Sequence, residues 1–269
     1  MAGPGKKRGR KPGGRLAPAI DLLAEVWRMG QTLPALPDSC RPKNLTEAYK
    51  VQALLEAELG FERAGWKIGC TSAVARAILK AEGPFAGRVF LARCHASGAA
   101  IASGQYRMRG LEAEFAFVLG KDLKPRKKPY SRAEMLAAVD DLHPAIEIVD
   151  SRYTDWLKVT LPELVADMGS NGALIVGPPA KNWRRKDLAK VAVTMAAGGK
   201  VVGKGKGADV MGHPLDALAW LANHPPSPEG LKAGEVVTTG TAAGFHRAGP
   251  KDKAVARFAG IGKVELSFV

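Results

Sequence analysis

The sequence predicts an α+β protein whose core is rich in β-strands. The chain has 269 residues, of which 31 are glycine and 18 are proline. So many turn-forming residues favour short strands joined by loops over a helical bundle. Strand patterns also outnumber helical patterns in the second half of the chain, and they do not alternate regularly with helices as in a parallel α/β fold.

The first part of the chain favours helices. Helical spacing of Leu, Ile, Val and Ala covers residues 17–29 and 46–59. Thr46 is expected to cap the second helix, and Gly60 is expected to end it because glycine readily adopts the left-handed conformation. We therefore divide the chain into a disordered basic tail at 1–15, a helical segment at 16–64 and a β-rich domain at 65–269.

Beyond residue 64 the pattern predicts mostly strands. Helices are expected from Ser72 to about Gly83, from a Ser131–Glu134 capping box to about Leu142, and over residues 213–224. Strands are expected at 65–70, 87–91, 111–119, 145–150, 172–177, 190–197 and 200–205, and in the closing stretches GEVVTTGT, KAVARFAG and GKVELSFV.

The net charge of +14 is unevenly distributed along the chain. Six Lys and Arg residues lie in the opening stretch MAGPGKKRGRKPGGR, whose composition cannot bury apolar surface. A nucleic-acid contact is one possible use of such a tail. Because no aromatic interleaving or recognition motif follows, we expect a solvated tail instead. A basic remainder suits an enzyme whose substrates are small anions.

Cysteine usage and hydropathy bear on the compartment. Cys40, Cys70 and Cys94 lie far apart and form no CxxC pair, which fits a reducing cytoplasm and inert thiols. No apolar run approaches the roughly 20 residues of a membrane helix, and no signal-peptide pattern is present. The five histidines show no ligand spacing. We expect a cytoplasmic protein with no membrane partner.

The stretch GLEAEFAFVLG at residues 110–120 places two charges at the head of an apolar run. On a strand, Glu112 and Glu114 point to one face, with Ala116 following them. The opposite face is entirely apolar, so the strand is expected to be covered on both sides. Two like charges beside buried surface repel each other and lose hydration, unless a bound cation compensates them.

A third carboxylate occupies a similar position in HPAIEIVDSRY. Glu147 shares a strand face with Val149, where an apolar residue would continue the pattern. Three carboxylates with few nitrogen or sulfur ligands favour a hard cation such as Mg²⁺ or Mn²⁺. Three surface glutamates on strand edges are the alternative, and the spacing Glu-x-Glu alone does not decide between them.

Six stretches of the sequence, taken together and in this order, carry a resemblance to a known family: GWKIGCTS, EAEFAFVLGKDL, HPAIEIVDSRY, VADMGSNGALIVG, GHPLDALAWLANH and LKAGEVVTTGTAAG. They resemble the fumarylacetoacetate hydrolase superfamily, most closely its 2-keto-4-pentenoate hydratase/4-oxalocrotonate decarboxylase branch, over roughly residues 45–269. The resemblance implies a mixed β-sandwich roll with peripheral helices and a divalent ion held by three carboxylates. Matched position by position, these ligands are Glu112, Glu114 and Glu147.

The same resemblance suggests two catalytic residues. Lys67 matches the family's active-site lysine, which can hydrogen-bond a developing enolate or relay a proton if its pKa is depressed. Ser170, in MGSNG, matches a position that faces substrate, with plain turn chemistry as the alternative. Asp167 is expected to cap or brace that turn.

Two further residues are candidates for substrate binding. Thr241, in TTGT, resembles the family's carboxylate-binding loop, although a turn at a strand end explains it nearly as well. Arg152 has two open interpretations, a structural pair with Asp150 or a contact with a substrate carboxylate.

One position departs from the family pattern. Many members of the branch carry an acidic residue in a PDYG-like turn, where it is thought to act with the lysine. Here the turn is GPFAG, which puts Phe85 at that position. An apolar side chain cannot transfer protons, so either another group such as Glu82 or a water replaces the acid, or the substrate differs.

The resemblance implies a metal-dependent lyase, a hydratase or decarboxylase acting on 2-hydroxydienoic or 2-oxo acids such as 2-hydroxypenta-2,4-dienoate. Such acids arise in the catabolism of aromatic compounds. The metal would chelate the C1 carboxylate and C2 oxygen and stabilise the enolate. The first alternative is a fumarylacetoacetate or acylpyruvate C–C hydrolase, and the second a non-catalytic or nucleic-acid-associated relative that uses the tail. We expect a homo-oligomer with a small-molecule substrate.

Overall fold

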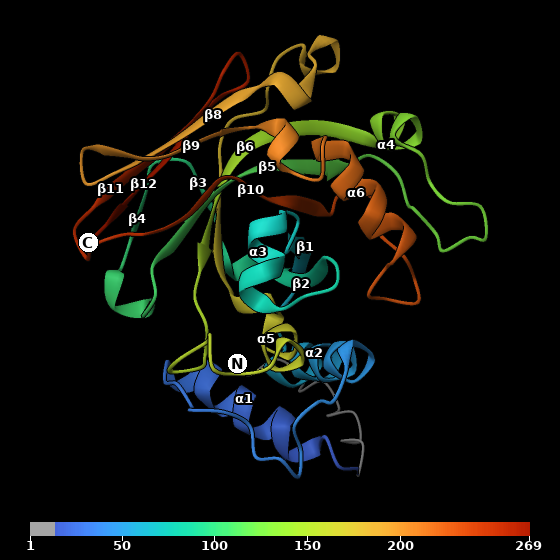
Figure 1. The fold of residues 1–269 in the computed structure, drawn as a ribbon, viewed down its shortest axis with the longest axis vertical. Coiled ribbons are helices and arrows are strands. Elements are labelled where there is room, and N and C mark those ends of the chain that lie inside the picture. The colour runs from blue at the N-terminus through green and yellow to red at the C-terminus, as the bar shows by residue number, and fades with distance from the viewer. Residues whose placement is uncertain (1–13) are drawn as a thin grey trace, which may run out of the picture.

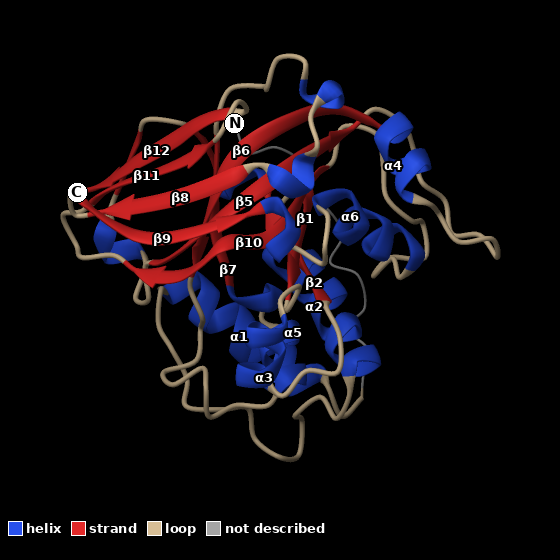
Figure 2. Cartoon of the chain, turned by 45° about the horizontal axis from the view of Figure 1, so that its top comes forward, coloured by secondary structure: helices blue, strands red, loops and turns tan. Residues whose placement is uncertain are grey.

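The computed structural model describes residues 14–269 and contains two β-sheets with helices at one end and one side (Figures 1 and 2). The α+β prediction is confirmed. The larger sheet has seven strands, in the order β2 (Phe85–Phe90), β1 (Arg63–Gly69), β10 (Val236–Arg247), β5 (Gly110–Leu119), β6 (Val139–Val149), β7 (Asn171–Val176) and β3 (Cys94–Ala96). Two of its pairs are parallel, β1 with β10 and β3 with β7, and the others are antiparallel.

The smaller sheet has five strands. Their order is β4 (Ala99–Ile101), β12 (Gly262–Phe268), β11 (Lys253–Phe258), β8 (Ala192–Ala197) and β9 (Lys200–Lys206). The two sheets share one core, in which the rings of Phe115 on β5 and Phe258 on β11 meet edge to face at 5.0 Å. One face of β5 therefore fills the space between the sheets, and its other face is free to build a site.

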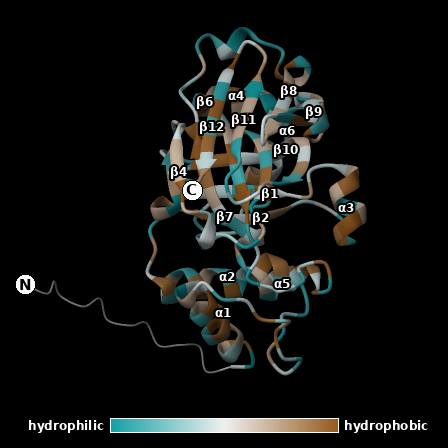
Figure 3. Cartoon of the chain, turned by 90° about the vertical axis from the view of Figure 1, so that its left-hand side faces the viewer, coloured by the Kyte–Doolittle hydropathy of each residue, from teal (hydrophilic) through white to brown (hydrophobic). Residues whose placement is uncertain are grey.

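Three helices form a layer below the larger sheet (Figures 1 and 3). They are α1 (Ala17–Met29), α2 (Leu45–Leu59) and α5 (Leu161–Ala166), and their buried side chains form one cluster with Phe85 and Phe90 of β2. The segment at 16–64 thus shares its core with strands of the domain that we placed at 65–269. Two other helices, α4 (Arg132–Ala138) and α6 (Pro214–Asn223), lie together and are joined by an ion pair between Arg132 and Asp216.

Two of the predicted helix-capping features are confirmed and one is wrong. The Ser131–Glu134 capping box is present, and Gly60 ends α2 in the left-handed conformation at φ 67°. The predicted N-cap Thr46 is wrong, since Asn44 caps α2 by accepting a hydrogen bond from the backbone N–H of Glu47. Asparagine is at least as good an N-cap as threonine.

Two predicted helices end earlier than expected, and three elements were not predicted. The helix expected to reach Leu142 ends at Ala138, and residues 139–144 begin the long strand β6 because they pair with β5 across the sheet. The helix expected to reach Gly83 ends earlier, so α3 spans Ala73–Leu79. Helix α5 and the short strands β3 and β4 were not predicted. Residues 139–144 form a strand because they pair with a strand distant in sequence, and sequence periodicity does not indicate such pairing.

The predicted basic tail lies outside the described residues except for Gly14 and Arg15. Arg15 is not part of a tail, because its guanidinium donates to the carbonyl of Arg41 at 2.6 Å and pairs with Glu47. Among residues 14–269, no helix has the length and apolar character needed to span a membrane.

Candidate metal centre and substrate cavity

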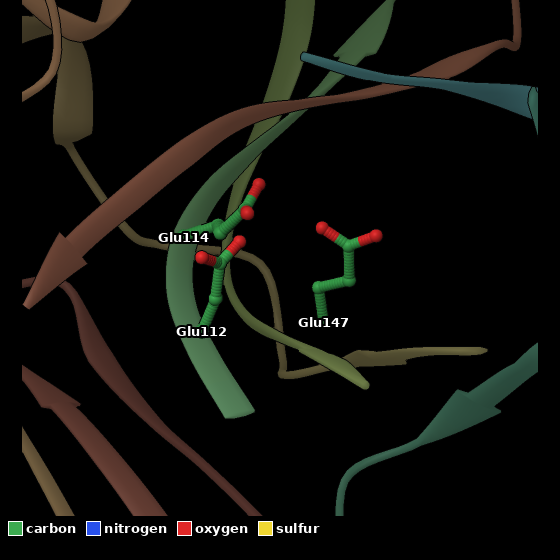
Figure 4. Close-up of side chains that lie close together, drawn as sticks. All are labelled: Glu112, Glu114 and Glu147. Atoms are coloured by element: carbon green, nitrogen blue, oxygen red, sulfur yellow. The ribbon is translucent and has the colours of Figure 1, made fainter. Parts of the chain in front are cut away.

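Strands β5 and β6 bring the three glutamates together (Figure 4). Glu112 lies directly across the antiparallel pair from Glu147, and Glu114 follows two residues along the same face of β5. Side chains two residues apart on a strand point the same way, and directly paired residues have neighbouring Cβ atoms. One carboxylate oxygen from each residue lies within 4.8 Å of the other two.

The surroundings of these carboxylates fit a cation. Glu114 and Glu147 are fully buried. Glu114 Oε2 accepts a hydrogen bond from the backbone N–H of Gly240 at 2.9 Å, and Glu147 Oε1 accepts one from Asn171 Nδ2 at 2.8 Å. Their second oxygens, Glu114 Oε1 and Glu147 Oε2, are buried without a hydrogen bond. Buried carboxylate oxygens are rarely left without a donor. Glu114 Oε1 is therefore available as a metal ligand, and so is Glu147 Oε2, which lies 3.3 Å from Lys67 Nζ.

The protein alone does not fully compensate this charge. Burial and the neighbouring Glu147 raise the pKa of Glu112 to about 7, although the charge of Lys67 lowers it. Burial followed by repulsion from Glu147 and Glu112 raises the pKa of Glu114 well above its ordinary value. A divalent ion would add two positive charges at the same place and stabilise all three carboxylates in the ionised form.

Lys67 lies beside the carboxylates on β1. Its Nζ is 3.3 Å from Glu147 Oε2 and donates a hydrogen bond to the carbonyl of Gly169 at 3.1 Å. Burial would lower the pKa of Lys67, but the charges of the three glutamates outweigh it and raise that pKa above its ordinary value. The three carboxylates therefore favour the ammonium form of Lys67, which offers a positive charge and a hydrogen-bond donor.

A strained turn of the backbone places Ser170 in the same site as Lys67 and Glu112. Met168, Gly169 and Ser170 all have positive φ, of 54°, 63° and 59°. Such conformations are costly for residues with a side chain and persist only where the surroundings impose them. Asp167 braces the turn as expected from the sequence, through its contacts with Arg152 at 2.6 Å and with the indole of Trp27 at 3.0 Å. Helix α1 thereby supports the turn that bears Ser170.

Phe85 occupies a space shaped for its ring. A Cβ atom on Gly69 would lie 2.3 Å from the ring, and one on Gly169 would lie 2.8 Å from it. Only glycine at these two positions lets the ring lie against the backbone. Lys67 Nζ lies 5.6 Å from the centre of the Phe85 ring, within the range of a cation–π contact.

These groups border one cavity of about 250 Å³. Lys67, Glu112 and Ser170 lie at its polar end, beside the backbone of Gly69 and Gly169. The rest of its lining is almost entirely apolar and comes from α3, α5 and the loop after β6, as well as Phe245 of β10. Cys70 also lines the cavity, and burial raises the pKa of its thiol to about 11, which disfavours the reactive thiolate.

The two candidate substrate-binding residues have different surroundings. Thr241 pairs with Glu114 across β10 and β5, and its hydroxyl donates to the carbonyl of Gly244 at 2.9 Å. It lies next to the carboxylates but does not border the cavity. Arg152 is buried, and its guanidinium donates to Asp167 and to the carbonyls of Asn171 and Asp167. Its partner is Asp167 and not Asp150, and these contacts favour the structural interpretation.

Several residues of the site escaped the sequence analysis. Asn171 orients Glu147, and the buried hydroxyl of Thr238, next to Lys67 in the sheet, makes no hydrogen bond. Both lie in stretches that we had singled out, MGSNG and TTGT, so their polar side chains were the available signal. Leu164 and Trp156 line the cavity from segments for which no element was predicted.

Comparison with known proteins supports this description. The family described as fumarylacetoacetate (FAA) hydrolase C-terminal matches residues 89–269. The chain is 35% identical to 2-hydroxyhexa-2,4-dienoate hydratase of Comamonas testosteroni, with 91% of this chain and 94% of that protein covered. It is 31% identical to 2-keto-4-pentenoate hydratase of Paraburkholderia xenovorans (strain LB400), with 93% of each covered.

Solved structures agree with the sequence comparison. The 4-oxalocrotonate decarboxylase of Pseudomonas putida G7, complexed with magnesium and adipate, superimposes with a TM-score of 0.84 at 27% identity, covering 94% of this chain and 98% of that one. Fumarylpyruvate hydrolase of Pseudomonas aeruginosa, in complex with Mn²⁺ and pyruvate, superimposes with a TM-score of 0.62 at 16% identity, covering 78% of this chain and 91% of that one. The second likeness shows a shared fold only.

Proposed function

Because the chain belongs to the fumarylacetoacetate hydrolase family, in its 2-keto-4-pentenoate hydratase branch, we propose that it is a metal-dependent hydro-lyase of 2-hydroxydienoic acids such as 2-hydroxypenta-2,4-dienoate. One observation carries this proposal. Three clustered carboxylates, two of them fully buried, stand beside a buried lysine at the polar end of a largely apolar cavity, and two of their oxygens accept no hydrogen bond. Such an arrangement suits a chelated 2-oxo acid.

We propose Glu112, Glu114 and Glu147 as ligands of Mg²⁺ or Mn²⁺, since all three donors are hard oxygens. When bound, the ion supplies a Lewis acid that holds the substrate's C1 carboxylate and C2 oxygen and stabilises negative charge on that oxygen. Magnesium accompanies the related decarboxylase structure, and calcium a second structure of the same enzyme.

The chain's own residues then guide the proton transfers. In a hydratase reaction the C2 hydroxyl loses its proton as the ketone forms, and a proton is added at C5. Water then adds across the remaining double bond, with hydroxide at C4 and a proton at C3. Lys67 would place its ammonium against the C2 oxygen, where negative charge develops, and Ser170 would hydrogen-bond the substrate from the strained turn. Thr241 and the backbone of its loop would stabilise the carboxylate end.

Two other reactions compete with hydration. Decarboxylation of a diacid is suggested by the likeness to 4-oxalocrotonate decarboxylase, and C–C hydrolysis would need an acid–base pair to activate water. Within residues 14–269, the charged residues that line the cavity are Lys67 and Glu112 alone, which favours a monocarboxylate. The non-catalytic alternative is opposed by the retention of three carboxylates whose burial is costly.

A direct assay tests the proposal. The dienol absorbs in the ultraviolet, so its loss can be followed with a panel of 2-hydroxydienoic acids, with and without Mg²⁺ or Mn²⁺. We expect metal-dependent loss of absorbance and formation of a 4-hydroxy-2-oxo acid. No turnover of any dienoic acid with either metal would contradict the proposed function.

We also propose a cytoplasmic homo-oligomer. All three cysteines are free in the structure, as expected in a reducing compartment. Val201 is 59% exposed and Val202 38% exposed on β9, an edge strand of the smaller sheet. Exposed apolar side chains on an edge strand favour contact with another chain. Light scattering on the purified protein tests this, and a monomer at micromolar concentration would contradict it.

A further inference from the structure

The cavity has two chemically different ends. Its polar end holds Lys67, Glu112 and Ser170, and the metal centre adjoins it. The remaining lining is almost entirely apolar, and no second cation lies in it among the described residues. A substrate held by its C1 carboxylate at the polar end must extend its other end into this apolar part.

The apolar part has an inner and an outer zone. Phe85 and Leu164 form the inner zone and are buried in the core that α1 and α2 share. Ile78 of α3, Leu157 of the loop after β6 and Phe245 of β10 form the outer zone. Ile78 and Leu157 are each 56% exposed, and Phe245 is 39% exposed.

This outer zone concentrates exposed apolar side chains. Nine large hydrophobic residues are exposed in the described chain, and Ile78, Leu157 and Phe245, three of these nine, border this one cavity. Helix α3, which carries Ile78, has no buried residue and stands away from the sheets (Figure 3). Isolated exposed apolar residues need no explanation, but a cluster around a cavity marks a surface that a ligand covers.

From this arrangement we propose that the substrate is a 2-hydroxydienoic acid with an extended apolar substituent at the end far from C1, and with no second carboxylate. The inference rests on the proposed function and specifies its substrate class. The substituent runs past Phe85 and is covered by Ile78, Leu157 and Phe245 at the mouth. A distal carboxylate in the same place would lose its hydration and find no cation to pair with.

Phe85 is the central specificity-determining residue in this arrangement. Its ring lies between the polar end, 5.6 Å from Lys67 Nζ, and the apolar residues with which it is buried, and it packs closely against Gly69 and Gly169. An acidic side chain at this position would bring charge to the path of the substituent. The phenyl ring instead offers apolar contact directly beyond the reacting carbons.

Binding of unreactive acids tests the inference without turnover. Calorimetry with saturating Mg²⁺ would compare straight-chain 2-oxo acids from 2-oxobutanoate to 2-oxooctanoate. We expect affinity to rise roughly fourfold for each methylene, the equivalent of ~0.8 kcal/mol per buried CH₂. 2-Oxoadipate, which ends in a carboxylate, should bind at least tenfold more weakly than 2-oxoheptanoate, consistent with the cost of burying an unpaired charge.

Two exposed positions on one helix provide a matched pair of variants. Ile78→Gln changes a side chain that borders the cavity, and Val74→Gln changes one that is 70% exposed on the same helix and does not border it. Glutamine is neutral, so neither variant disturbs the helix dipole. Ile78→Gln should reduce the ratio of 2-oxooctanoate to 2-oxobutanoate affinity about fourfold or more, and Val74→Gln should leave that ratio unchanged.

The outcomes separate this inference from the proposed function. If short acids bind and dienoic acids turn over, but affinity is independent of chain length or favours 2-oxoadipate, the inference is wrong and the proposed function stands. An equal loss in Ile78→Gln and Val74→Gln would also overturn it. If no 2-oxo acid binds with Mg²⁺ and no dienoic acid reacts, the proposed function itself fails.

Discussion

At the scale of single residues, Lys67 is the group whose chemistry the structure changes most. The sequence left open whether it relays a proton through a lowered pKa, whereas its three acidic neighbours raise that pKa. We propose that its ammonium form supplies a positive charge beside the reacting oxygen. It needs no acidic partner at position 85 for that purpose.

Replacing Lys67 by Met removes this charge at similar side-chain length. We expect kcat to fall by roughly 10²-fold or more, the usual scale for removing one group that stabilises developing negative charge. KM should change less, because the carboxylates that would hold the ion remain. Steady-state kinetics on the best dienoic acid measure both, and a kcat close to that of the unaltered enzyme would show that another residue performs this task.

The carboxylates allow a test that does not depend on turnover. Binding of Mg²⁺ should stabilise the fold by about 2.7 kcal/mol at a hundredfold excess over Kd. A chelator should therefore lower Tm, and added Mg²⁺ or Mn²⁺ should restore it. Glu112→Gln should abolish this response, and Glu265→Gln, at an exposed carboxylate far from the site, should keep it. A full metal response in Glu112→Gln would remove Glu112 from the ligand set.

At the scale of elements, α2 is tied to the site by one buried amide. Gln52 donates to the carbonyl of Ala86 in β2 at 3.1 Å and to that of Val165 in α5 at 2.6 Å, and it accepts from Arg88 at 2.6 Å. These bonds join the helix layer to the strand that carries Phe85. The pattern of helical residues in α2 did not indicate them.

Gln52→Met should leave two buried carbonyls and a buried guanidinium without this partner. Unsatisfied buried groups cost about 1–3 kcal/mol each, so we expect at least ~2 kcal/mol less stability in urea unfolding. Gln105→Met, at an exposed glutamine, should stay within about 0.5 kcal/mol. Equal stability of the two variants would mean that water replaces the lost bonds.

Helix α4 contains a carboxylate, Glu134, whose contribution to stability depends on pH. Hydrogen bonds from the Ser131 backbone and from Arg126 lower the pKa of Glu134 from 4.5 to about 2. Because the folded-state pKa is depressed, the stability that Glu134 contributes is present above pH 4.5 and is lost as the pH falls towards 2. Glu134→Gln should lower Tm at neutral pH, and its difference from the unaltered protein should shrink below pH 4.5. A difference independent of pH would contradict this.

At the scale of the whole molecule, the N-terminal helices support residues of the site. Trp27 of α1 holds Asp167, which braces the turn bearing Ser170, and the cluster around α1 and α2 buries Phe85 and Leu164. The division into a helical segment and a separate catalytic domain therefore describes the sequence pattern better than it describes the packing.

Two truncations test this view. A chain that begins at residue 65 should lose its cooperative thermal transition and its response to Mg²⁺, because Phe85 and Leu164 would be exposed. A chain that begins at Gly14 should keep the Tm and turnover of the full chain, since composition predicts no core for the opening residues and Arg15 is retained. Retained folding from residue 65, or a large loss from residue 14, would each overturn the corresponding expectation.

Much of this protein could be predicted from the sequence because the signals are local. Helical spacing located α1 and α2, strand alternation put Glu112 and Glu114 on one face, and the ordered motifs indicated the family. Other features depend on residues far apart in the chain, which pattern analysis does not report. The register of β5 against β6 sets Glu147 opposite Glu112, Gly69 and Gly169 shape the space for Phe85, and Asp167 holds Arg152 within the core. Each of these is decided by packing between distant segments, and so only the tertiary structure reveals it.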